Sequence, residues 1–144
     1  MKNFIPTISD VSAVIGVIAG GVATLLGGAD VVLKTLLIVM LLDYFTGVIV
    51  ALVFHTSNKT ATGAYSSAIG FRGIVRKCVI ILMVFIAYRL DILLDTTVIR
   101  NSVCFAYIVN DLASITENVG LMGVPIPQKI VEAIDILKNK EEEN

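Results

Sequence analysis

Long apolar runs alternate with short polar segments along this chain, and the runs have the lengths of helices that cross a lipid bilayer. A crossing helix needs about 20 mostly apolar residues, because the hydrocarbon core of a bilayer is about 30 Å thick. Runs of that order occur at about residues 11–29, 34–54, 74–94 and 99–118. The pattern predicts an all-α integral membrane protein with about four transmembrane helices, in which residues 1–144 form a single membrane domain.

The third run is the weakest of the four. Its uninterrupted apolar part, residues 78–88, spans 11 residues and is too short to cross a bilayer alone. A full crossing over 74–94 requires Arg76, Lys77 and Arg89 to extend their charged ends toward the membrane surface. The alternative is three crossings, with the first or the third helix lying along the membrane.

The C-terminal part of the chain has a different pattern. Gly123 to Pro127 predicts a rigid turn, since Pro127 suits the first position of a helix. A short amphipathic helix follows at about 127–138, and residues 139–144 form a charged tail. Its apolar face collects Ile126, Ile130, Val131, Ile134 and Leu137. We expect this helix to lie on the membrane surface or against the transmembrane helices.

Small residues recur along one face of the first predicted helix. They follow a spacing of four: Ser12, Gly16, Gly20, Thr24 and Gly28. Gly47 and Ala51 offer a shorter face of the same kind in the second helix. Small side chains let two helix backbones approach closely in lipid, where van der Waals contact drives association. Both faces therefore predict close packing, either between helices of one chain or between copies in a homo-oligomer.

Asp43 lies near the middle of the second predicted helix. An aspartate at that depth costs on the order of 2.5–3.5 kcal/mol on insertion scales, so it should face protein or water. The candidate partners are Tyr44, Thr46 and the basic residues Arg72, Arg76 and Lys77. Two interpretations remain open: an internal pair that only stabilises the helices, or a group that relays protons or holds a cation.

The fourth predicted helix carries a polar stripe in its second half. The stripe consists of Asn110, Asp111, Ser114, Glu117 and Asn118, at steps of three and four beside apolar positions. In an oligomer it would face a hydrated lumen. The alternative is a terminal turn that emerges into cytoplasmic water.

Charge placement predicts the orientation. The polar stretch 55–73 and the residues just after it contain basic side chains and no acid, so the positive-inside rule places this loop, and with it both termini, in the cytoplasm.

Hydrophobic residues make up 56% of the chain and the mean hydropathy is +0.89, which disfavours a soluble domain. The net charge of −1 gives no reason to expect a nucleic-acid partner.

The chain contains no motif typical of an enzyme or a cofactor site. We find no phosphate-binding glycine loop, no metal-ligand cluster and no nucleophile elbow. We therefore expect neither catalysis nor a cofactor.

Four short patches, in order along the chain, share one resemblance. The first is Leu42-Asp43-Tyr44-Phe45-Thr46-Gly47, and the second is Ser67 with Gly70, Gly73, Ile74 and Lys77. The third combines Asn110-Asp111, Ser114-Ile115 and Glu117-Asn118, and the fourth is Gly123-Val124-Pro125-Ile126-Pro127. Together they resemble the toxin-secretion and phage-lysis holins, small membrane proteins of phages, prophages and clostridial toxin loci. Asp111 departs from the glutamate usual in that family.

The resemblance implies a function that composition and periodicity do not reveal. It implies a protein that self-associates in the bacterial cytoplasmic membrane and opens lesions that release an endolysin or a toxin. It also admits an antiholin-like regulator as a partner or as the protein's own role. A small ion channel or transporter is the other alternative. The first predicted helix lies outside the resemblance.

Overall fold

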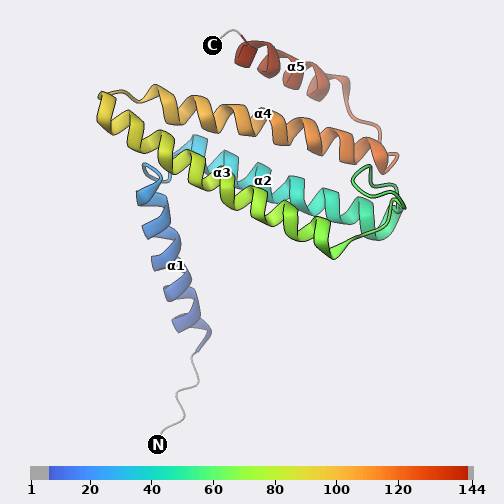
Figure 1. Ribbon diagram of the computed structural model, residues 1–144, viewed down its shortest axis with the longest axis horizontal. Coiled ribbons are helices and arrows are strands. Elements are labelled where there is room, and N and C mark those ends of the chain that lie inside the picture. The colour runs from blue at the N-terminus through green and yellow to red at the C-terminus, as the bar shows by residue number, and fades with distance from the viewer. Residues whose placement is uncertain (1–6, 143–144) are drawn as a thin grey trace, which may run out of the picture.

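The computed structural model describes residues 7–142, and within this range the chain is helical without strands. This confirms the predicted all-α class. The helices are α1 (Ile8–Leu25), α2 (Val31–Ile49), the π-helical segment η1 (Val50–Phe54) that continues α2, α3 (Ser67–Leu94), α4 (Val98–Leu121) and α5 (Gln128–Glu142). Figure 1 shows α2, α3 and α4 side by side along their lengths, with α5 lying along α4.

Helix α4 is the centre of the packing, since it contacts α2, α3 and α5. Apolar side chains from the turn after α1 and from α2, α3 and α4 form the core: Leu26, Leu33, Leu36, Met40, Ile80, Val84, Cys104 and Ile108. Most of these residues recur at helical spacing on one face of their helix. The three helices α2 to α4 therefore form a bundle held by one continuous apolar seam.

Helix α1 projects away from this bundle (Figure 1) and buries none of its side chains. It ends at Leu25, before a turn in which Gly27 and Gly28 have φ of +92° and +99°. A Cβ on Gly27 would lie 2.8 Å from Cδ2 of Tyr88. Gly27 is therefore required twice, by its backbone conformation and by the close approach of the Tyr88 ring.

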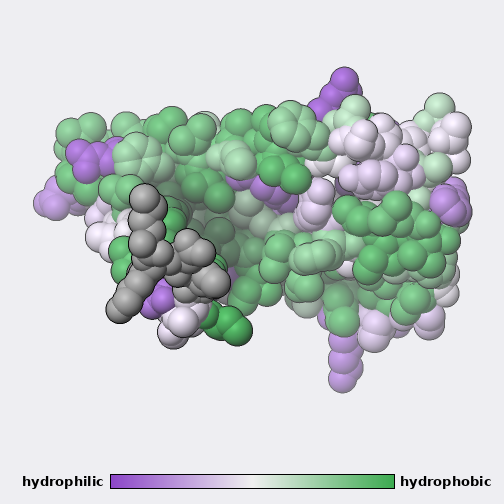
Figure 2. Space-filling model, turned by 90° about the horizontal axis from the view of Figure 1, so that it is seen from below, coloured by the Kyte–Doolittle hydropathy of each residue, from purple (hydrophilic) through white to green (hydrophobic). Residues whose placement is uncertain are grey.

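Within residues 7–142, two helical segments have the length and apolar composition of a membrane crossing: Ile8–Leu25 and Val31–Phe54. Helices α3 and α4, of 28 and 24 residues, are long enough but are more polar. Much of the outer surface is apolar, as Figure 2 shows for the face seen from below. Phe45, Leu52 and Leu82, for example, are 54%, 51% and 58% exposed. An apolar exterior of this extent is typical of contact with lipid or with another protein.

Several boundaries differ from those expected. Helix α3 begins at Ser67 instead of about 74, so the segment that precedes the apolar run is helical. Helix α4 continues to Leu121. Helix α5 continues to Glu142, so most of the expected tail 139–144 is helical, and Lys140 in the last turn complements the helix dipole. Residues 143–144 lie outside the described range.

Helix α5 lies against α4, which is one of its two expected positions. Ile134 is its buried contact, at 7% exposure. Ile130 and Val131, which share the expected apolar face, remain 48% and 41% exposed. The apolar face of α5 is thus only partly covered by the bundle.

Candidate functional site

Three ionisable side chains meet between α2, α3 and α4, roughly midway along the bundle. We call Asp43, Lys77 and Asp111 the charged triad. The Lys77 ammonium Nζ lies 2.7 Å from Oδ2 of Asp43 and 2.7 Å from each carboxylate oxygen of Asp111. Each residue lies one helical turn from a core position of its own helix, and this spacing turns all three side chains inward.

The two acids of the triad are buried, Lys77 is largely covered, and the three charges do not balance. The side chains of Lys77, Asp43 and Asp111 are 16%, 11% and 4% exposed. One ammonium faces two carboxylates, and Oδ1 of Asp43 is buried without a hydrogen-bond partner. A buried charge needs a paired, hydrogen-bonded environment. Lys77 supplies this environment for both acids, so it links three helices through one atom.

Asp43 therefore has an internal partner in the third helix. Of the candidates raised by the sequence, Lys77 forms the ion pair, while the Thr46 hydroxyl donates to the backbone carbonyl of Asp43 at 3.1 Å. Arg72 and Arg76 are exposed and form no ion pair or hydrogen bond within the described residues. The structure thus contains the internal pair that one of the two interpretations of Asp43 required.

The polar stripe of α4 divides into a buried edge and an exposed edge. Asp111 and Asn118 are 3% and 5% exposed, whereas Asn110 and Glu117 are exposed and Ser114 is half-buried. The Asn118 amide donates to the Thr46 hydroxyl of α2 at 3.0 Å. The buried edge therefore joins α4 to its neighbours, and only the other edge is open to a lumen or to solvent.

The partners of Glu117 and of the small face of α2 also lie within the chain. The Asn58 amide of the loop before α3 donates to Glu117 at 2.9 Å. A Cβ on Gly47 would lie 3.7 Å from Nδ2 of Asn118, and Ala51 is buried at 7% exposure. The small residues Gly47 and Ala51 therefore lie at internal packing positions.

The small face of α1 contacts no other helix of the described chain. Ser12, Gly16, Gly20 and Thr24 are exposed, and a Cβ added to either glycine would meet no neighbour within 4 Å. Gly28, the fifth expected member, lies in the turn after the helix and not on its face. The face is four residues long in the structure and remains available for packing.

A second polar cluster, which we did not predict, lies at the opposite end of the bundle from the 55–66 loop. Arg100 is 6% exposed, and its guanidinium donates to both carboxylate oxygens of Asp30, at 2.7 and 3.1 Å. It also donates to the carbonyls of Leu26 and Gly28, which follow the end of α1. The hydrogen bond from Arg100 lowers the pKa of Asp30 below its ordinary value. Arg100 thus attaches the α1–α2 turn to α4.

Asp91 completes this cluster from the last turn of α3. Its carboxylate accepts the backbone N–H groups of Ile99 and Arg100, at 3.0 and 2.9 Å, and the Thr96 hydroxyl at 2.6 Å. These N–H groups begin α4 and have no partner within that helix. Asp91 therefore caps α4 from a neighbouring helix. In the sequence, Asp30, Asp91 and Arg100 stand out as charged residues near the ends of predicted helices. The sequence did not show which of these helix ends meet.

The described residues contain no group of three or more His, Cys, Asp or Glu side chains arranged to hold a metal ion. The two polar clusters instead join helices: the charged triad joins α2, α3 and α4, and the Arg100 cluster joins the α1–α2 turn to α4. These contacts can set the relative positions of helices within a membrane.

Comparison with known proteins assigns the sequence to a family. Residues 20–139 match the bacteriophage holin family. An uncharacterized protein of Halalkalibacterium halodurans is 39% identical over 131 residues, which cover 87% of this chain and 91% of that protein. An uncharacterized 14.9 kDa protein in the nagH 3′ region of Clostridium perfringens is 40% identical over 116 residues, covering 79% and 82% of the two chains.

A relative with a functional name comes from a phage. The probable holin of Bacillus phage phi105 is 30% identical over 108 residues, which cover 74% of each chain. No solved structure matches this chain.

Proposed function

This chain belongs to the bacteriophage holin family, and on that premise we propose that it self-assembles in the bacterial cytoplasmic membrane and opens pores that release an endolysin or a toxin. The observation that carries the proposal is the family match over residues 20–139, a range that includes all three members of the charged triad. An apolar exterior around a charged interior fits a protein that resides in lipid.

We propose four membrane crossings, formed by α1, by α2 with η1, by α3 and by α4, with both termini in the cytoplasm. The loop 55–66 and the start of α3 carry the basic side chains that favour the cytoplasmic side. The test is cysteine labelling of Asn58, Thr97 and Asn139 in intact cells. An impermeant reagent should label the Thr97→Cys variant alone. Labelling of that variant from the cytoplasmic side only would overturn this topology.

In the assembled pore, the exposed edge of the α4 stripe faces water and the exposed face of α1 packs against another copy. Asn110 and Glu117 are the exposed polar groups of that edge, while Asp111 and Asn118 hold the bundle. Replacing both Asn110 and Glu117 with Leu should leave membrane insertion intact and lower permeabilisation. Unchanged permeabilisation would place the aqueous path elsewhere. Replacing the lipid-facing Leu41 and Leu82 with Ile is the matched control.

The function itself is tested by controlled expression in bacteria. Induction should collapse the membrane potential, reported by a potential-sensitive dye, and should cause lysis when a cytosolic endolysin is also present. Preserved potential at high expression would contradict the proposal. If expression alone is harmless but delays lysis by another holin, the chain acts as an antiholin-like regulator.

One observation favours a narrow channel as the second candidate. Oδ1 of Asp43 is buried without a hydrogen-bond partner, a group that a conducted ion or proton could approach. A narrow channel would dissipate ion gradients while retaining a folded cytosolic enzyme. A holin would release that enzyme, so the size of the released solute separates the two functions.

A further inference from the structure

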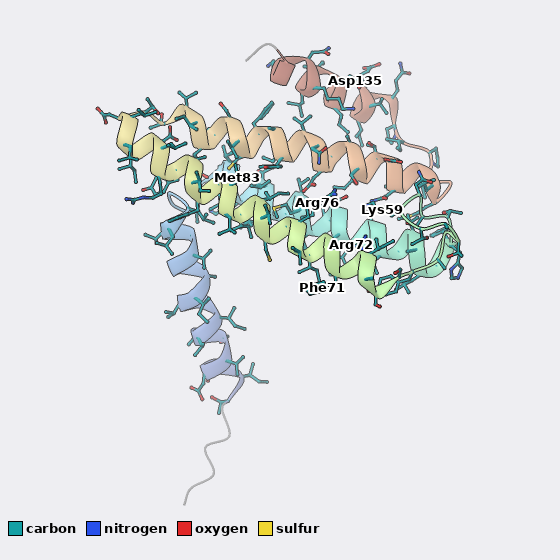
Figure 3. All side chains as sticks on the ribbon, viewed as in Figure 1. Lys59, Phe71, Arg72, Arg76, Met83 and Asp135 are labelled. Carbon is teal, nitrogen blue, oxygen red and sulfur yellow. The ribbon has the colours of Figure 1, made fainter. Side chains whose placement is uncertain are left out.

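Arg72 and Arg76 form an exposed basic pair near the start of α3. They are four residues apart, so they lie on the same face one turn from each other. Both are exposed, and neither forms an ion pair or hydrogen bond within the described residues. Figure 3 labels them at the loop end of the bundle, together with Lys59. Two arginines without protein partners at one site require an explanation beyond the charged triad.

Between residues 68 and 79 of α3, the exposed residues other than the two arginines are apolar. Phe71, Val75 and Val79 are 67%, 44% and 49% exposed, and in Figure 3 Phe71 extends from the opposite edge of α3. This part of the helix surface therefore suits contact with lipid chains as well as with headgroups. A guanidinium in such surroundings is stable only if an anionic or hydrated group lies within its reach.

The geometry of α3 directs both side chains toward the membrane surface. At a rise of about 1.5 Å per residue, Arg72 and Arg76 lie roughly 7 and 13 Å along the axis from Ser67, where α3 begins. Helical side chains point back toward the N-terminus of their helix. For α3 that end adjoins the loop, so both guanidinium groups are directed toward the headgroups of the same leaflet.

The local charge also selects an anionic partner. No acidic residue occurs between Asp43 and Asp91 in the sequence. The acids of α4 nearest this end are engaged, Asp111 by Lys77 and Glu117 by Asn58. The arginine pair thus carries a positive charge that no acid of α3 or α4 neutralises.

We propose that Arg72 and Arg76 bind the phosphate of an anionic phospholipid, such as phosphatidylglycerol, in the leaflet that contacts the 55–66 loop. Arginine forms paired hydrogen bonds to phosphate oxygens, and two arginines one turn apart can hold a single headgroup. The headgroup would fix the depth of α3, whose polar first turns precede its apolar part. This inference rests on the membrane insertion proposed above and does not require pore formation.

The test is native mass spectrometry of the purified full-length protein in mild detergent, titrated with phosphatidylglycerol or with phosphatidylcholine of the same chains. Wild type should retain phosphatidylglycerol preferentially. The Arg72→Gln, Arg76→Gln double variant should lower its retention roughly 30-fold, since two basic groups near a headgroup together contribute about 2 kcal/mol and each tenfold corresponds to about 1.4 kcal/mol. The matched control, Lys34→Gln with Arg89→Gln, removes the same charge from exposed residues at the other end of the bundle.

Each outcome decides the proposal. Equal retention by wild type and the arginine double variant would overturn it. Equal losses in both double variants would indicate nonspecific attraction by net charge, which also overturns it. Displacement of the lipid by inorganic phosphate at matched concentration would make the site one for free phosphate. Carbonate extraction of membranes separately checks insertion, so a failure of the proposed membrane location is recognised independently.

Discussion

Replacing Lys77 with Met should be the most damaging single substitution in the charged triad. Lys77 is the only cation within hydrogen-bond distance of the Asp43 and Asp111 carboxylates in the described structure. Its removal leaves two buried carboxylates facing each other. Removing one partner of a buried ion pair costs about 3–5 kcal/mol, because the remaining charge is uncompensated. Because the Lys77→Met variant leaves two such charges, its loss of stability should lie at or above the upper end of that range.

Removing one acid should cost much less. In the Asp111→Asn variant, Lys77 and Asp43 form a neutral one-to-one pair, and the new amide can still accept a hydrogen bond from Lys77. The expected loss is about 1 kcal/mol, the net value of a typical hydrogen bond. Lys77→Met combined with Asp43→Leu and Asp111→Leu should regain much of the lost stability, because no buried charge remains.

The assay is unfolding of the purified protein in mild detergent by titration with sodium dodecyl sulfate, followed by far-UV circular dichroism. The matched control is Arg89→Met, an exposed basic residue of the same helix. Lys77 does not compensate the two carboxylates if Lys77→Met is no less stable than Asp111→Asn, or if the triple variant is less stable than Lys77→Met alone.

Two further predictions concern the turn after α1 and the packing of α2. Gly27→Ala should lower the free energy of unfolding by at least about 1–2 kcal/mol, because φ is +92° and the new Cβ meets Tyr88. Gly47→Ala should change the free energy of unfolding by less than about 1 kcal/mol. Detergent unfolding checks both variants. Arg100 lowers the pKa of Asp30, so the stability difference between wild type and Asp30→Asn should be full above about pH 4 and vanish as pH falls through the lowered pKa. A difference that persists in strong acid would contradict the role of the Asp30 carboxylate.

The periodic apolar runs predicted the helices well, but not where each begins. The first turns of α3 contain Gly70 and Gly73, and glycine disfavours a helix by itself. Contact with α2 stabilises these first turns. Gly73 lies so close to the Tyr44 ring of α2 that a Cβ added to it would be 3.6 Å from the ring. A local pattern cannot register a contact with a residue of another helix.

The candidate site was predictable in part for the same reason. Asp43 and Asp111 stand out as acids within apolar surroundings, and the need of Asp43 for a partner in the third helix follows from the cost of burying a charge. That one lysine serves both acids depends on how three helices are placed. The pairing of Asp30 with Arg100, 70 residues apart, likewise depends on which helix ends meet.

The decisive measurement of pore formation is reconstitution of the purified chain into vesicles that contain a small fluorescent anion and a folded globular enzyme. We predict that the protein releases both cargoes and that release rises steeply with the number of copies per vesicle, as assembly of a wide pore requires. Release of the small anion with full retention of the enzyme at every protein density would contradict the holin function.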